Sequence, residues 1–201
     1  MSHVQVPLIS DTTENTDTFL AFQSTQVVEM KGLILSKGSI GMEGVKEKMR
    51  QKLVAAIKNG QTLLLRLTDT RPDLNKDYNS DDFFPTDKVF ECKTEEIDDD
   101  ADEQQFGGFG GKVGDAKTAG VAGYSQPKDA VTRGTKGVFG VQEKVWLKKV
   151  FREAEYEAGA PICRPGFRVV VTTNLSVDSI KEKLGDLLPL SRCKVIGVRA
   201  Q

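Results

Sequence analysis

Three polar residues at the end of a β-branched run are the strongest candidates for chemistry in this chain. The segment FRVVVTTNLS, residues 167–176, predicts a buried strand that ends in Thr172, Thr173 and Asn174. Ligands of parallel α/β proteins bind at the carboxyl ends of the strands. In a nucleotide-binding protein, a polar strand end of this kind faces the terminal phosphate. Thr173 and Asn174 are therefore the residues to weigh as phosphate sensors.

A nucleoside triphosphate site also needs a phosphate loop and magnesium-binding acids, and the sequence places neither. No GxxxxGK(S/T) pattern occurs, so the backbone N–H cradle, the lysine and the metal-binding hydroxyl are missing together. The nearest imitation, Gly110-Gly111-Lys112, is followed by Val113, which has no hydroxyl, and it comes after the buried run TLLLRLTD instead of before it. That run carries Arg66 where an acid is required, and a cation there repels magnesium.

We therefore expect the side chains of Thr172, Thr173 and Asn174 to satisfy backbone groups at the strand end and at the entry to the next helix. This interpretation leaves the chain without a cofactor, a metal or a catalytic residue. Asp69 is the one acid near the end of the buried run, and its position before TRPD is typical of a turn.

The cysteines and the acidic run do not form a nucleophilic or metal site on sequence grounds. Cys163 could act as a nucleophile, but the only histidine, His3, lies near the amino terminus, so no base is expected beside the thiol. The three cysteines are too widely spaced for a disulfide framework, which suits a reducing compartment. The acidic run EEIDDDADE lacks the ligand spacing and central glycine of a calcium loop.

The elements that would position these residues predict an α/β fold. We expect a mostly parallel sheet of about four strands flanked by helices, interrupted by a long irregular insertion. The strands and helices alternate as strand 30–36, helix 43–58, strand 62–67, helix 142–158, strand 167–173, helix 176–188 and strand 193–198.

The chain divides into four parts on this interpretation. Residues 1–29 form an amino-terminal extension, 30–68 the first half of the core, 69–140 the insertion and 141–201 the second half. Turn-forming residues and the acidic run open the insertion, and residues 107–140 hold 10 of the 19 glycines of the chain. A segment of this length without periodic structure is unusual inside a compact domain.

Charge and hydropathy exclude two classes of partner. The chain has 28 basic and 29 acidic residues, so no general attraction to nucleic acid is expected. No apolar run approaches the roughly 18 residues of a membrane-spanning helix. We expect a cytoplasmic protein with neither a nucleic-acid nor a membrane partner.

Three blocks of the sequence resemble part of an AAA+ module of a dynein heavy chain. The helix and strand of VKEKMRQKLVAAIKNGQTLLLRL are similar to the approach to the Walker B strand, VWLKKVFREAEYEAG to a helix of the family, and RPGFRVVVTTNL to the strand of sensor 1. The blocks cover about two-fifths of the chain in the family's order. The resemblance implies a partial P-loop-like core without Walker A, in which Asn174 corresponds to the sensor 1 residue.

The resemblance implies a structural role in the cytoskeleton, in the axoneme of the cilium or flagellum. We expect a non-catalytic scaffold subunit of a radial spoke or doublet-associated complex, which binds its protein partners through its surface and the insertion. Aromatic side chains suit partner pockets, and the expected partner-binding residues are Phe83, Phe84, Phe90, Phe106, Phe109, Tyr124 and Phe139. Two alternatives remain: a regulatory nucleotide-binding subunit that completes its site with a neighbouring chain, and a metabolic enzyme on a doubly wound sheet.

Overall fold

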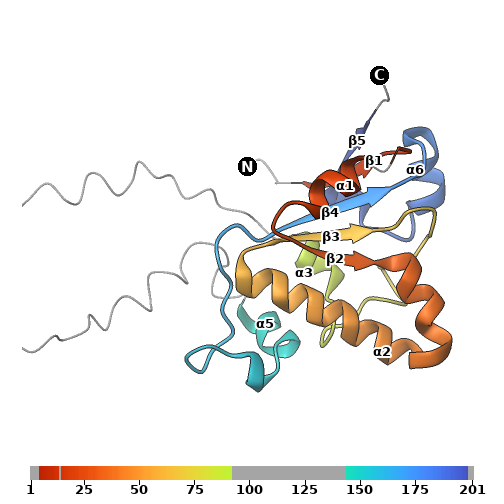
Figure 1. Cartoon of the computed structure of the whole chain (residues 1–201). Helices are drawn as coiled ribbons and strands as arrows, with labels where there is room; N and C mark the ends of the chain where they lie inside the picture. The colour runs from red at the N-terminus through yellow and green to blue at the C-terminus, as the bar shows by residue number, and fades with distance from the viewer. Residues whose placement is uncertain (1–4, 14, 92–143, 199–201) are drawn as a thin grey trace, which may run out of the picture.

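A five-stranded parallel sheet forms the centre of the protein. The computed structural model describes residues 5–13, 15–91 and 144–198. The strands are β1 (Val6–Ser10), β2 (Thr25–Glu29), β3 (Thr62–Arg66), β4 (Arg168–Thr173) and β5 (Cys193–Gly197). They lie in the order β2-β3-β4-β1-β5, and every neighbouring pair is parallel (Figure 1). The predicted α/β class with a parallel sheet is confirmed, and the sheet has one strand more than expected.

The two faces of the sheet are covered unequally. Side chains alternate between the faces of a strand, and one face joins a continuous buried cluster through Leu8, Leu63 and Val171. This face packs against α2 (Met30–Asn59), α3 (Thr86–Phe90), α5 (Lys144–Val150) and α6 (Val177–Leu184). The opposite face carries Leu64 and Val170, and in the described part of the chain α1 (Asn15–Ala21) is the one helix on it (Figure 1).

The predicted strand over residues 30–36 is wrong. The strand is β2, residues Thr25–Glu29, and α2 begins at Met30 and contains the predicted helix 43–58. Short apolar runs such as GLIL do not distinguish a strand from a helix by themselves. Gly41 lies within α2 at φ 70° and ψ 173°, which kinks the helix and divides it into two arms.

The amino-terminal residues belong to the core and are not an extension. β1 lies between β4 and β5, and Leu8 is completely buried. Pro7 obscured this strand, because proline lacks a backbone donor and is rare in the middle of a sheet. In the structure Pro7 pairs in register with Lys194 of β5.

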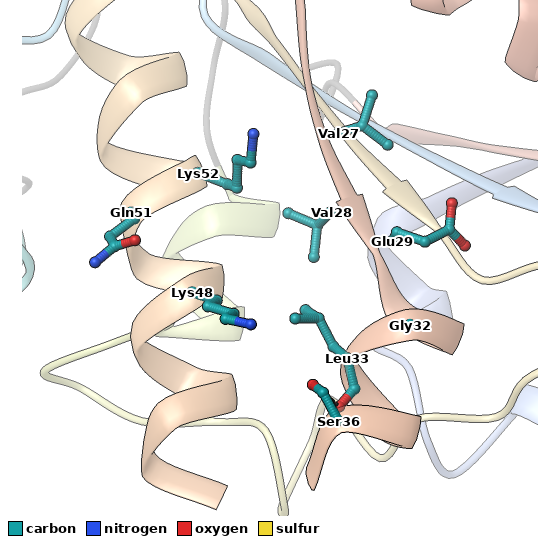
Figure 2. Close-up of a pocket in the computed structure, with 9 residues that line it drawn as sticks. All are labelled: Val27, Val28, Glu29, Gly32, Leu33, Ser36, Lys48, Gln51 and Lys52. Atoms are coloured by element: carbon teal, nitrogen blue, oxygen red, sulfur yellow. Dashed lines mark hydrogen bonds between the residues drawn. The ribbon is translucent and has the colours of Figure 1, made fainter. Parts of the chain in front are cut away.

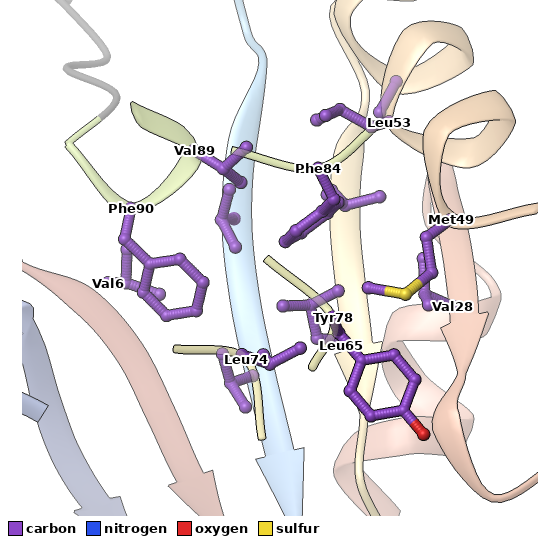
Figure 3. Packing of buried hydrophobic residues seen from close by; sticks show 14 of the residues in the cluster. Val6, Val28, Met49, Leu53, Leu65, Leu74, Tyr78, Phe84, Val89 and Phe90 are labelled. Atoms are coloured by element: carbon purple, nitrogen blue, oxygen red, sulfur yellow. The ribbon is translucent and has the colours of Figure 1, made fainter. Parts of the chain in front are cut away.

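The first part of the predicted insertion packs into the core as well. Residues 69–91 contribute Leu74, Tyr78, Phe84 and Phe90, which lie against the sheet and α2 (Figure 3). Thr86 Oγ1 donates a 2.6 Å hydrogen bond to the carbonyl of Leu74 and holds this segment together. The remainder of the predicted insertion, from residue 92, lies outside the described residues.

The helices and strands after residue 143 occur where they were predicted, but each is shorter than its predicted range. α5 ends at Val150, well before the predicted residue 158, and a 3-10 turn, Glu153–Glu155, follows it. β4, α6 and β5 lie within the predicted ranges 167–173, 176–188 and 193–198.

Candidate functional site

The topology identifies one place in the sheet where a ligand is expected. β4 and β1 are neighbours in the sheet. The chain after β1 runs past β4 and β3 to the outer strand β2, whereas the chain after β4 runs in the opposite direction, past β1 to β5. A crevice forms at the carboxyl ends of two neighbouring parallel strands whose connections diverge in this way. The candidate site is therefore the end of β1, with Ser10 and Asp11, and the end of β4, with Thr173 and Asn174.

The Asp11 carboxylate lies at the end of β1, where a bound phosphate would be expected. Its Oδ1 accepts hydrogen bonds from the backbone N–H of Thr13 at 2.8 Å and from the Thr13 hydroxyl at 2.6 Å. Its Oδ2 accepts a 2.7 Å bond from the backbone N–H of Thr16. Backbone donors between a strand and the following helix are the groups that bind phosphate in nucleotide sites. Here the Asp11 carboxylate already occupies two of them.

The electrostatics of Asp11 agree with a permanent charge. The residue is 3% exposed. Burial would raise the pKa of Asp11, but hydrogen bonds from Thr13 and Thr16 outweigh burial and hold the pKa of this carboxyl well below its usual range. A phosphate entering this crevice would meet a fixed negative charge.

The polar end of β4 serves the backbone through Thr173, whereas Thr172 Oγ1, which was expected to do the same, is buried without a hydrogen-bond partner among the described residues. The Thr173 hydroxyl donates to the carbonyl of Thr68 at 3.0 Å and accepts a bond from the backbone N–H of Leu175 at 3.2 Å. The backbone N–H of Asn174 also donates to Thr68, at 2.9 Å. On β1, Ser10 Oγ donates to the carbonyl of Leu175 at 2.7 Å. These bonds tie the loops after β1, β3 and β4 together at the crevice.

Arg66 does not have the electrostatic role that the sequence suggested. Its Nε lies 2.7 Å from Asp17 Oδ2, and its Nη1 lies 3.2 Å from Glu29 Oε2. Two carboxylates outweigh the cation, so Arg66 does not present a free positive charge that would repel magnesium. Its role is to hold α1 and the end of β2 against β3. The charge that disfavours a triphosphate comes from Asp11, which sequence reasoning did not identify.

Other candidate residues are structural. Asp69 forms an exposed 2.9 Å ion pair with Lys31. Burial raises the pKa of the Cys163 thiol to about 12, so the thiolate that a nucleophile requires is scarce at neutral pH. His3, the Gly110-Gly111-Lys112 motif and the acidic run EEIDDDADE lie outside the described residues.

Two of the predicted partner-binding aromatics are core residues. Phe84 is 0% exposed and Phe90 is 1% exposed, so neither can enter a partner pocket while the domain is folded (Figure 3). Phe83 is half-buried, and the Arg152 guanidinium lies 5.5 Å from the centre of its ring. The remaining four, Phe106, Phe109, Tyr124 and Phe139, lie outside the described residues.

Sequence reasoning missed two hollows beside β2, because it assigned this strand to an extension. A groove of about 340 Å³ lies between β2 and α2 and is lined by Val28, Leu33, Lys48 and Lys52 among others (Figure 2). A second hollow of about 280 Å³ lies between β2 and α1, with Arg66 at one side. The β-branched residues Thr25, Val27 and Val28 were the available signal for a strand here.

Over the described ranges there is no cluster of three or more histidine, cysteine or acidic residues able to hold a metal. None of the described helices has both the length and the apolar character needed to cross a bilayer. Comparisons with protein-family models, curated proteins and solved structures found no match to this chain.

Proposed function

We propose that this chain is a non-catalytic structural subunit, an α/β sheet that supports protein–protein contacts and performs no nucleotide chemistry. The observation that carries the proposal is the closed crevice between β1 and β4, where the Asp11 carboxylate binds the backbone N–H of Thr16 at 2.7 Å. A fold does not bring its function with it when the site has been replaced.

The neighbouring polar groups add to this argument. A phosphate sensor must leave its side chain available to the ligand, whereas the Thr173 hydroxyl is buried and bonded to Thr68 and Leu175. Breaking these bonds to admit a ligand would expose buried donors and acceptors without partners, which costs about 1–3 kcal/mol for each group. The crevice is thus built to stay closed.

The setting of this scaffold follows from the resemblance to a dynein AAA+ module. We infer a subunit of a large protein assembly in the ciliary or flagellar axoneme, such as a radial spoke or a doublet-associated complex. The hollows beside β2 offer surface for protein partners, as do two exposed aromatic residues, Phe19 of α1 (64% exposed) and Phe22 just after this helix (86% exposed).

A nucleotide titration tests the absence of a nucleotide site. Thermal unfolding of the full chain is measured with ATP or ADP and magnesium, together with hydrolysis of labelled ATP. A ligand present at 100 times its Kd would stabilise the folded state by about 2.7 kcal/mol, or roughly 5–10 °C for a chain of this size. We expect no shift and no hydrolysis. A shift of this size would overturn the proposal in favour of a nucleotide-binding subunit.

The cellular setting needs a separate measurement. The tagged chain, expressed in ciliated cells, is expected to lie along the axoneme and to stay there during high-salt extraction. Absence from the axoneme would remove the setting and leave the scaffold itself untouched.

A further inference from the structure

We propose that the outer edge of β2 binds an extended segment of a partner protein as a sixth strand, and that acidic and apolar residues alternate in this segment. The inference rests on the proposed function, because it names the chemistry of one partner of the scaffold. β2 has a free edge, and the hollows on the two faces beside it differ in chemistry.

The backbone of β2 has an unpaired edge. Within the described part of the chain, β2 is an outer strand of the sheet and pairs with β3 alone. The backbone N–H of Thr62 donates to the carbonyl of Ser24, so the parallel pattern directs Gln26 and Val28 towards β3 and leaves Thr25, Val27 and Glu29 facing outwards. Thr25 and Val27 form no backbone hydrogen bond to another described residue, whereas the Glu29 carbonyl belongs to the first turn of α2. Such an edge is a template for an added strand.

The groove on the α2 side of this edge is basic. Lys48 and Lys52 are exposed on α2. Lys48 extends towards Leu33 (Figure 2), and Lys52 Nζ lies 3.5 Å from Gln26 Oε1 of β2. Glu29, the one acid that lines the groove, is paired with Arg66 at 3.2 Å. Two lysines therefore face the groove without a lining acid to neutralise them, which favours acidic side chains on this side.

The hollow on the α1 side is mostly apolar. Ala21, Phe22, Val27 and Leu64 line it, and Phe22 is 86% exposed. Asp17 closes one end through its ion pair with Arg66. An aliphatic side chain inserted here would cover Phe22 and Val27, both of which are now in contact with solvent.

The two hollows match the geometry of a strand. Successive side chains of a strand point to opposite faces, so a segment paired with β2 would direct alternate residues into the basic groove and into the apolar hollow. Added strands obtain affinity from main-chain bonds and specificity from such alternating pockets. Two hollows of different chemistry on the two sides of one free edge specify an alternating acidic and apolar sequence.

The experiment uses fluorescein-labelled nine-residue peptides and the full chain, with fluorescence anisotropy as the readout. A peptide of alternating Glu and Val is expected to bind. A peptide of alternating Lys and Val, and one with the same Glu and Val residues in two separate blocks, should bind at least tenfold more weakly. Equal binding of all three would overturn the proposal, as would no binding of the Glu/Val peptide at millimolar concentration.

Backbone pairing is tested with two N-methylated forms of the Glu/Val peptide, in which alternate amides are methylated in one frame or the other. An added strand directs one set of its amides to β2 and the other set away from it. We expect one frame to abolish binding and the other to retain it. Similar binding by both frames would exclude a sixth strand. This test uses the unmodified protein, so it does not depend on the folding of a variant.

The basic groove is tested with a matched pair of charge reversals. Lys48→Glu combined with Lys52→Glu should weaken binding of the Glu/Val peptide at least tenfold. Lys76→Glu combined with Lys181→Glu makes the same change in net charge at exposed positions elsewhere and should alter the Kd less than twofold. Equal effects of the two pairs would show attraction by overall charge alone and would overturn the proposed site.

The acidic run of the chain is the alternative occupant. If the peptide binds only after residues 94–103 are replaced by a Gly/Ser segment of equal length, this run occupies the edge and the partner proposal fails. The nucleotide titration distinguishes these outcomes from failure of the proposed function, because it measures a different site.

Discussion

Arg50 and Glu155, which are separated by 105 residues in the sequence, form a 2.6 Å ion pair between α2 and the 3-10 turn after α5. Arg50 is 3% exposed and also binds Glu47 and the carbonyl of Val150. This bidentate network joins the parts of the chain before and after residues 92–143. Burying a cation is tolerable only with such complete pairing, so Arg50 fixes the position of the second half of the chain on α2.

Replacing Arg50 tests the strength of this junction. Arg50→Met removes the cation and leaves Glu47 and Glu155 facing each other, so the free energy of unfolding should fall by about 3–5 kcal/mol in urea titrations. Arg50→Lys keeps the charge but cannot form the planar fork, and its loss should be smaller. The control is Lys149→Met, which breaks an exposed 2.9 Å pair with Asp81 and should cost less than about 1 kcal/mol. A similar loss for both methionine variants would contradict the assignment.

The free energy of unfolding should depend on pH through the Asp11 carboxylate, which holds the crevice between β1 and β4 closed. The folded-state pKa of Asp11 lies below its ordinary value of about 3.9. The stability that this carboxylate contributes is therefore complete above about pH 5 and is lost as the pH falls below 4. Asp11→Asn should lower the free energy of unfolding at pH 7 by about 1–3 kcal/mol. The difference between the two proteins should shrink as the pH approaches 3.

Asp82→Asn provides the control, because Asp82 is exposed. This variant should differ from the unmodified chain by less than about 0.5 kcal/mol at each pH. If Asp11→Asn is no less stable than Asp82→Asn at pH 7, the crevice is not held closed by the Asp11 carboxylate, and the proposed function loses its main support.

The sequence predicted β3, β4 and β5 correctly, missed β1 and misplaced β2, for physical reasons. Leu63–Leu65 form a short apolar run with both faces covered, and Val169–Val171 are β-branched, so local composition reports β3 and β4. β1 was missed because Pro7 is unfavourable in a strand interior. Tertiary packing decided the remaining differences, which local patterns do not report.

The candidate site shows the same division. The polar end of β4 was located because Thr173 and Asn174 follow a recognisable strand, and its backbone role was predicted correctly for the Thr173 side chain but not for Thr172. Asp11 was missed, since SDTTENT has the composition of an ordinary loop. A signal was present: an aspartate with threonines two and five residues later, before a helix, can bond the free N–H groups of the first turn. Identifying it required knowing that β1 precedes this loop.

Alanine variants of Phe84 and Phe83 should differ in stability, because Phe84 is packed in the core and Phe83 is half-buried at the surface. Phe84→Ala removes a fully buried ring and should cost about 3–5 kcal/mol. Phe83→Ala removes a half-buried ring that lies under the Arg152 cation, and it should cost about 1 kcal/mol or less. Chemical denaturation of the two variants measures the difference. Equal costs would show that residues 69–91 are not part of the cooperative core.

Two glycines of α2 should respond to alanine substitution in opposite ways. Gly60 lies at the end of the helix, and Gly38 lies within its first arm. Gly60 ends α2 at φ 62° and ψ 35°, in the left-handed region, and its N–H bonds the carbonyls of Ala56 and Ile57. A Cβ there would also overlap the backbone carbonyl of Pro165. Gly60→Ala should therefore destabilise the protein by at least about 2 kcal/mol.

Gly38 has the opposite expectation. It lies inside α2, and no atom is found within 4 Å of a Cβ added to it. Alanine lowers the backbone entropy of the unfolded chain and favours the helix, so Gly38→Ala should stabilise the protein by about 0.5–1 kcal/mol. Thermal unfolding of the two variants gives shifts of opposite sign if the kinked helix and its contact with Pro165 are correct. Shifts of the same sign would refute that arrangement, because a glycine required for its conformation and one that is merely tolerated cannot respond alike.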